Sequence, residues 1–122
     1  MKPSPYNVAE KSPQNMEQDL MDQVAIVYEK GALWAESQTM YEQLEDLKHT
    51  VLAKNMSGEG SIASQEMTAR TSVDYINHLK GLAEARCRAL AAKVAYGCAQ
   101  AKYDALRTLL SNKREATKRG IE

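Results

Sequence analysis

Proline is confined to the first thirteen residues of this 122-residue chain, at Pro3, Pro5 and Pro13. Proline removes a backbone hydrogen-bond donor and breaks or kinks a helix from within. Everything after Pro13 can therefore form helix without a forced kink. Aromatic residues make up only 6% of the chain and Phe is absent, so a core has to be filled by Ala, Leu, Val and Met, which suits helix packed on helix. The sequence predicts an all-α fold.

A first long helix is expected from about Pro13 to about Lys54. Ser12 is a suitable cap, because its hydroxyl can accept a hydrogen bond from a free amide and proline fits the first helical position. Apolar residues then recur every three, four or seven positions, which is typical of an amphipathic helix. These residues are Leu20, Val24, Val27, Trp34, Tyr41, Leu44, Leu47 and Val51. The helix would be roughly 60 Å long at 1.5 Å per residue, and the sequence leaves open whether it bends at Gly31.

Two glycines in the segment NMSGEGS end this pattern and predict a turn. A short helix of one or two turns is expected over residues 64–70. Thr71 and Ser72 then offer caps for a final helix from about Val73 to about Lys118. Many alanines make this helix slim, so that a partner helix can approach closely. Its predicted apolar line consists of Ile76, Leu79, Ala83, Cys87, Leu90, Val94, Gly97, Ala101 and Leu109.

Two amphipathic helices joined by a short break predict a long antiparallel hairpin with a short connecting helix, as a single domain over residues 13–122. Residues 1–12 mix Pro, Ser and Asn without periodicity and are expected to form a flexible tail. A hairpin covers only one stripe of each helix, which is too little for a stable small fold. We therefore expect an oligomeric coiled-coil bundle, joined through the remaining apolar positions Tyr96, Tyr103, Leu106 and Leu110.

The two halves of the chain carry opposite charge, although the formal net charge is zero. Residues 1–60 hold five lysines against ten acidic residues, a net charge of −5. Residues 61–122 hold eleven Lys and Arg against six acidic residues, a net charge of +5. Such an asymmetry points to pairing between copies, to a polyanionic partner, or to both.

Basic residues recur at multiples of seven along the final helix and form a cationic ridge. They are Arg86, Lys93, Arg107 and Arg114, with Gln100 in the gap. This spacing suits contact with successive phosphates of a nucleic acid strand. It also suits the flanks of a coiled coil, where acids of a neighbouring helix are met, and we favour that pairing for Arg86 and Lys93. An external anion and compensation of the helix dipole both stay open for the terminal cluster, which consists of Lys113, Arg114, Lys118 and Arg119.

No combination of residues in the sequence suits catalysis, so neither an enzyme nor a cofactor is expected. His49 and His78 are interpreted as surface imidazoles, because too few further ligands accompany them for a metal site. Cys87 and Cys98 are interpreted as small packing residues in a reducing compartment. No run approaches the roughly 18 apolar residues that a membrane helix needs. We expect a cytoplasmic protein without contact to a membrane.

The segments LKHTVLAKNM after Tyr41, SQEMTAR followed by Tyr75, HLKGLAEAR and ALRTLLSNKREA together span about 80 residues. In their order they resemble a family of small phage-encoded helical proteins from recombination gene regions. The chain is also distantly similar to the UvsY-type recombination mediators, oligomeric helical proteins that bind single-stranded DNA and help to load a recombinase in place of single-strand-binding protein. The resemblance implies that basic residues face DNA in an oligomer, at Arg107, Lys113, Arg114, Lys118 and Arg119.

The expected function is therefore that of a phage accessory protein of recombination or replication. Its partners would be further copies of itself, single-stranded DNA, and a phage recombinase or single-strand-binding protein. The alternative belongs to another class, a protein-interaction module that acts through its acidic first helix as an assembly chaperone or as an inhibitor of a host protein.

Overall fold

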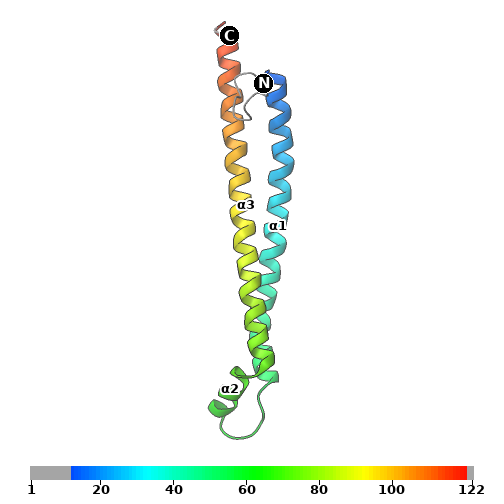
Figure 1. Cartoon of the computed structure of the whole chain (residues 1–122), viewed down its shortest axis with the longest axis vertical. Coiled ribbons are helices and arrows are strands. Elements are labelled where there is room, and N and C mark those ends of the chain that lie inside the picture. Colours follow the sequence, from blue (N-terminus) through cyan, green and yellow to red (C-terminus); the bar gives the residue numbers. More distant parts are fainter. Residues whose placement is uncertain (1–11, 121–122) are drawn as a thin grey trace, which may run out of the picture. The chain divides into compact units, whose positions relative to one another are not determined.

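A computed structural model describes residues 12–120, which form three helices (Figure 1). The helices are α1 (Pro13–Lys54), α2 (Ile62–Arg70) and α3 (Val73–Lys118). No strand occurs among residues 12–120. The prediction of an all-α fold with two long helices and one short helix is therefore confirmed. Apart from Ser12, the predicted tail lies outside the described residues.

The starts of the two long helices follow from their capping residues. The Ser12 hydroxyl accepts a hydrogen bond from the Asn15 amide at 3.2 Å. At the start of α3, the Ser72 hydroxyl accepts one from the Tyr75 amide, also at 3.2 Å. Asp74 lies in the first turn of α3, where a negative charge is favoured by the helix dipole. Both predicted starts are confirmed.

Two glycines turn the chain between α1 and α2. Gly58 and Gly60 have φ angles of 78° and 84°, in the left-handed region that glycine enters without steric cost. The Ser61 hydroxyl then accepts a hydrogen bond from the Ser64 amide at 3.2 Å. Because this cap directly follows the second glycine, α2 begins at Ile62, slightly earlier than predicted.

The chain divides into two compact units. Of the described residues, unit 1 contains 12–31 and 95–120, and unit 2 is Ala32–Val94. The start of α1 and the end of α3 therefore belong to unit 1. The remainder of both helices, together with α2, belongs to unit 2. None of the helices in the described part of the chain has the length and apolar character needed to cross a membrane.

The core of unit 1 lies between its segments of α1 and α3. Met16 and Gln23 are buried on α1, and Ala99 and Leu110 are buried on α3. The Gln23 amide nitrogen donates a hydrogen bond to the Ala99 carbonyl at 3.0 Å. Burial of a polar side chain is tolerable only when it is paired in this way.

Unit 2 has a core of small residues. Ala85 and Ala89 of α3 and Ala69 of α2 are buried, as are Tyr75 and Leu82. On α1 the half-buried residues include Trp34, Tyr41 and Leu44. His78 Nε2 donates to the Leu44 carbonyl at 2.8 Å, which ties α3 to α1 within this unit.

The residues that α3 turns inward differ from those predicted. A row at intervals of seven is buried or half-buried and is called the inner row; it consists of Tyr75, Leu82, Ala89, Tyr96, Tyr103 and Leu110. By contrast, most of the predicted apolar line is exposed, including Leu90 at 53% and Val94 at 66%. The prediction was wrong because α3 carries two apolar stripes, and the one with the larger side chains, three Tyr and two Leu, is the one that is buried.

The same difference changes the role of the residues that were expected to join copies. Leu110 is buried within its own unit, and Tyr96, Tyr103 and Leu106 are half-buried there. These positions therefore serve the internal core of unit 1.

Candidate nucleic-acid interface

The seven predicted binding residues fall into two groups. Arg86 and Lys93 lie in unit 2, and the other five lie in unit 1. Of those five, the structure brings three around one surface hollow, namely Arg107, Arg114 and Lys118. We refer to these three residues as the cation triplet.

The hollow in unit 1 has a volume of about 270 Å³. Its lining consists of Leu20 from α1 and, from α3, the cation triplet with Leu110, Ser111 and Glu115. Residues three, four and seven positions apart share a face of a helix. This rule places the triplet and Ser111 side by side, so the hollow offers two guanidinium groups, one ammonium group and a hydroxyl. Ser111 was not predicted as a site residue, although its spacing of four from Arg107 and three from Arg114 places it on the same face.

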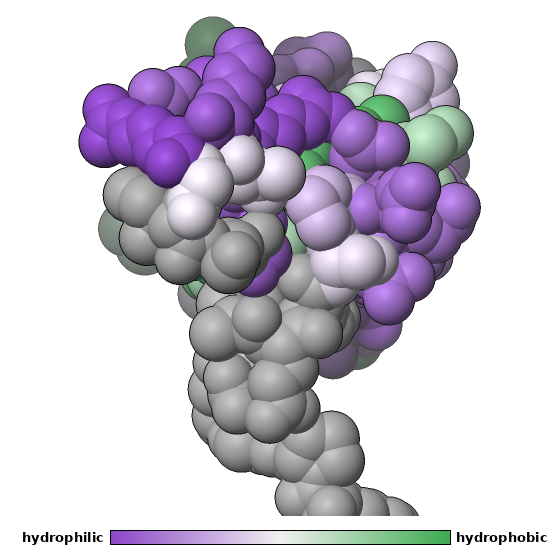
Figure 2. Space-filling view, turned by 90° about the horizontal axis from the view of Figure 1, so that it is seen from above, coloured by the Kyte–Doolittle hydropathy of each residue, from purple (hydrophilic) through white to green (hydrophobic). Residues whose placement is uncertain are grey.

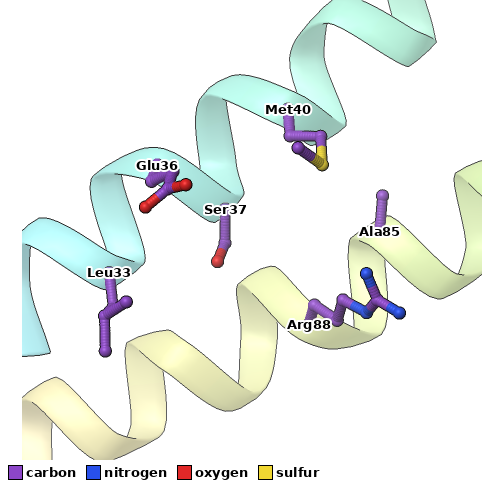
Figure 3. A pocket seen from close by; sticks show the side chains of 6 residues that line it. All are labelled: Leu33, Glu36, Ser37, Met40, Ala85 and Arg88. Atoms are coloured by element: carbon purple, nitrogen blue, oxygen red, sulfur yellow. The ribbon is translucent and has the colours of Figure 1, made fainter.

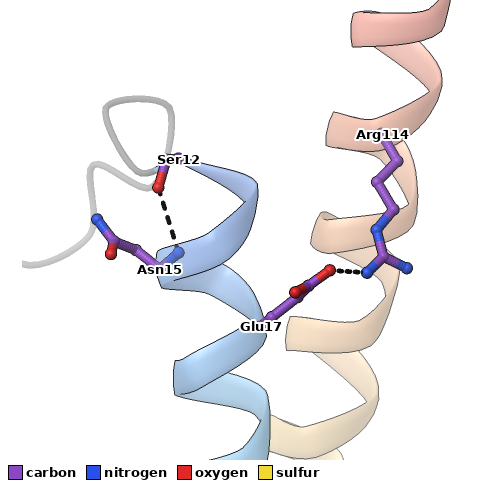
Figure 4. A network of polar contacts seen from close by, with 4 residues as sticks. All are labelled: Ser12, Asn15, Glu17 and Arg114. Atoms are coloured by element: carbon purple, nitrogen blue, oxygen red, sulfur yellow. Dashed lines mark hydrogen bonds and ion pairs between the residues drawn. The ribbon is translucent and has the colours of Figure 1, made fainter.

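Within the triplet, Arg114 forms an ion pair with Glu17 of α1 (Figure 4). Both side chains remain exposed, Arg114 at 54% and Glu17 at 46%. Exposed ion pairs contribute only about 0–1 kcal/mol, because water screens them and two long side chains lose freedom. A phosphate can therefore compete with Glu17 for this guanidinium.

Arg107 and Lys118 are exposed and form no ion pair with any described residue. Glu115 is the one acidic residue of the lining. Its carboxylate forms an ion pair with the guanidinium of Arg119, one helical turn away, with 3.2 Å between Oε1 and Nη2. The negative charge of Glu115 is thereby partly compensated, and the hollow keeps an excess of positive charge.

Arg119 and Lys113 are separate from the triplet. Arg119 is exposed and is held by Glu115. Lys113 is half-buried and already engaged in a contact. It follows Leu106 and Leu110 at helical spacing, so it continues the inward-facing side of α3. The terminal cluster predicted from sequence is thus divided between two faces of the helix.

Arg86 and Lys93 are exposed in unit 2. Neither forms an ion pair with an acid of α1 in the described part of the chain. The Lys93 ammonium lies 5.9 Å from the centroid of the Trp34 ring instead, at the outer limit of a cation–π contact. Arg86 therefore keeps its charge available for an external partner.

The end of unit 1 where α1 begins and α3 ends presents a mostly hydrophilic surface (Figure 2). Purple, hydrophilic residues cover most of the coloured surface, and the green, apolar areas among them and at its edges are smaller. Such a surface matches a ligand that is itself charged or polar, since contiguous apolar patches are what indicate apolar partners.

Among residues 12–120, no three His, Cys, Asp or Glu side chains are placed to hold one ion. His78 bonds to the Leu44 carbonyl, so only His49 is an exposed imidazole as predicted. Cys87 and Cys98 are both exposed free thiols, which corrects their interpretation as packing residues. They belong to the outward side of α3.

No protein-family model, curated protein or solved structure matches this chain.

Proposed function

We propose that this protein is a non-enzymatic accessory protein of phage recombination or replication that binds single-stranded DNA as an oligomer. In this proposal the two long helices form an antiparallel hairpin, and several hairpins form a bundle. DNA is held at the C-terminal part of α3, and the bound strand is handed to a recombinase. The observation that carries the proposal is the cation triplet around the hollow of unit 1.

The hollow suits a phosphodiester. Arg107 and Arg114 each present several N–H donors in a planar fork that matches phosphate oxygens. Lys118 adds a compact positive charge, and the Ser111 hydroxyl adds a neutral donor. These contacts read the backbone and not the base, so binding would be independent of sequence. Such independence is what a protein that coats arbitrary single strands requires.

Binding by one copy would be weak, since each copy contributes only three cations. About three neutralised phosphates correspond to a slope of about −2 in a plot of log affinity against log salt for a single strand. Several linked copies would multiply the effect, because each further contact is intramolecular once the first has formed. Oligomer formation is therefore part of the mechanism.

The test is a fluorescence anisotropy titration of a labelled oligonucleotide of about 30 residues, at salt concentrations from about 50 to 200 mM. The double variant Arg107→Glu with Lys118→Glu is expected to lose at least about tenfold in affinity. The matched control, Lys54→Glu with Arg70→Glu, makes the same charge change in unit 2 and should retain most binding. Absence of salt-sensitive binding in the wild type, or equal losses in both variants, would refute the proposal.

A second candidate function is a protein-interaction module that uses α1. It is favoured by four exposed acids of α1 that form no ion pair with described residues, namely Glu29, Glu36, Glu45 and Asp46. A row of carboxylates can imitate the charge of a nucleic acid. Capture of host proteins before and after nuclease treatment distinguishes the two functions, because a direct protein partner persists when nucleic acid is removed.

A further inference from the structure

An apolar stripe on α3 is exposed in unit 2. This outer stripe consists of Ile76, Leu79, Ala83, Cys87, Leu90 and Val94, all of them exposed. Its members are three or four positions apart and therefore share one face of the helix. Isolated apolar residues on a surface need no explanation, but a continuous stripe of this kind is typical of an interface. The outer stripe has the periodicity of a helix that packs against another helix.

A second apolar surface of unit 2 belongs to α1. Leu33, Met40 and Leu47 are exposed and lie seven positions apart; we call them the α1 row. Beside this row lies a hollow of about 200 Å³ between α1 and α3 (Figure 3). It is lined by Leu33, Glu36, Ser37, Met40, Ala85 and Arg88.

We propose that a second copy of this chain docks here, with the outer stripe of one copy packed on the α1 row and hollow of the other. The inference deepens the proposed function, because it names the surface through which the oligomer forms. It does not depend on DNA binding.

The shape of the hollow supports this arrangement. Leu33 and Met40 provide apolar walls, and Ala85 has a side chain short enough to leave space between the helices (Figure 3). A branched apolar side chain that enters such a space forms the knob-into-hole contact of packed helices. Leu90 and Val94 are the most exposed large side chains of the outer stripe and are suitable knobs.

Charge decides which surface of the second copy fits. Residues 73–94 of α3 hold four basic and two acidic side chains, whereas residues 32–54 of α1 hold two basic and four acidic ones. Packing α3 on α3 would bring like charges together, and packing α1 on α1 would do the same. Packing α3 on α1 brings opposite charges together, which favours that pairing.

Two of these charges flank the apolar surfaces directly. Arg86 lies three residues after Ala83 and four before Leu90, so it borders the outer stripe. Glu36 lines the hollow beside the α1 row. Neither side chain forms an ion pair within the described part of its own chain. Both are therefore available to a neighbouring copy.

The first experiment measures the mass of the purified full chain by light scattering, without DNA. The mass of the wild type should be at least twice the 13.6 kDa of one chain. Leu90→Glu and Met40→Glu should each give about the mass of one chain, because either change places a charge in the interface. Met67→Glu is the matched control, since Met67 is an exposed apolar residue on α2, and it should assemble like the wild type. Circular dichroism checks that each variant keeps its helices.

A monomeric wild type would overturn the proposal. So would normal assembly of both Leu90→Glu and Met40→Glu. Because no DNA is present, either result is separate from failure of the DNA titration.

The second experiment uses the native thiol of Cys87. In a Cys98→Ser background it is the only cysteine of the chain, and Met40→Cys adds a partner thiol on the α1 row. Ala85 lines the hollow with Met40, whereas Cys87 is two residues further on and points to another side of α3. A disulfide between Cys87 and position 40 should therefore join two copies.

Mild oxidation should give covalent dimers only when both thiols are present. The control with Cys87→Ser in addition to Met40→Cys and Cys98→Ser should give none. Equal dimer formation by Cys87 alone would show that α3 pairs with α3 and would overturn the proposal.

Discussion

Gly31 of α1 lies against the ring of Tyr96 of α3, and a β-carbon at position 31 would be 3.1 Å from Tyr96 Cε2. The Tyr96 hydroxyl accepts a hydrogen bond from the Gln100 amide nitrogen at 2.9 Å. α1 continues through Gly31 without interruption. The glycine in the middle of this helix therefore provides space for an aromatic ring.

Replacing Gly31 by Ala should stabilise the protein less than the same change at Gly97. Both glycines lie inside helices, where Ala is favoured by about 0.8–1 kcal/mol. A β-carbon at Gly97 would meet no atom within 4 Å, so Gly97→Ala should realise most of that gain. At Gly31 the Tyr96 ring must first shift. Urea unfolding measures both, and an equal gain at the two sites would contradict the packing role.

Gln23 should respond differently to removal and to replacement. Gln23→Ala leaves a space in the core of unit 1 and removes the hydrogen bond to Ala99, which should lower the free energy of unfolding by about 1–3 kcal/mol. Gln23→Leu fills the space, so its loss should be under about 1.5 kcal/mol. The exposed Gln14 serves as the control for substitution by Ala. Equal losses for the Ala and Leu variants would contradict this account.

The two stripes of α3 should differ in their tolerance of truncation. Leu110 is only 4% exposed, so Leu110→Ala should cost about 2–4 kcal/mol. Leu90 is on the outer stripe, and Leu90→Ala should cost less than about 1 kcal/mol in a single copy. Thermal unfolding at a protein concentration low enough to separate copies measures both values. A larger loss at Leu90 would mean that the inner row is assigned incorrectly.

The turn before α2 should depend on glycine. Gly60 has a positive φ, and a residue with a β-carbon there costs about 1–2 kcal/mol. Gly60→Ala should therefore lower the melting temperature. Gly81 has no positive φ and open space around its α-carbon, so Gly81→Ala should raise it. A stabilised Gly60→Ala variant would contradict the assigned turn.

Glu17 should act as a competitor of DNA. Glu17→Gln removes the partner of Arg114 and, under the proposed function, should strengthen oligonucleotide binding by up to about fivefold. Stability should change little, because the pair is exposed. Glu115→Gln is the comparison, since Glu115 holds Arg119 and also lines the hollow. Unchanged or weaker binding by Glu17→Gln would argue against a phosphate at Arg114.

The sequence was sufficient to predict the elements of the fold. Ser12, Ser72 and the two turn glycines each have a local effect on the backbone, so they locate helix ends without knowledge of the remainder of the chain. The inner row was not predictable in the same way. Periodicity identifies both stripes of α3, and only packing against α1 decides which of them is buried.

The candidate site was predicted in composition but not in geometry. Heptad spacing correctly placed Arg107 and Arg114 on one face. The ion pair between Arg114 and Glu17 depends on the axial alignment of two helix segments 97 residues apart in sequence. Local patterns do not specify that alignment. The hollow also excludes Lys113, which is half-buried on the inward-facing side of α3, and a count of positive charges does not reveal that orientation.

The buried alanines in the cores of the two units have a thermodynamic consequence. Ala85, Ala89 and Ala99 contribute few methyl groups to the interior, and no large side chain in the described residues is fully buried. The heat-capacity increment of unfolding grows with the apolar area that becomes hydrated, and globular proteins average about 12–15 cal/mol/K per residue. A single copy should fall below that range, so its free energy of unfolding should curve only gently with temperature.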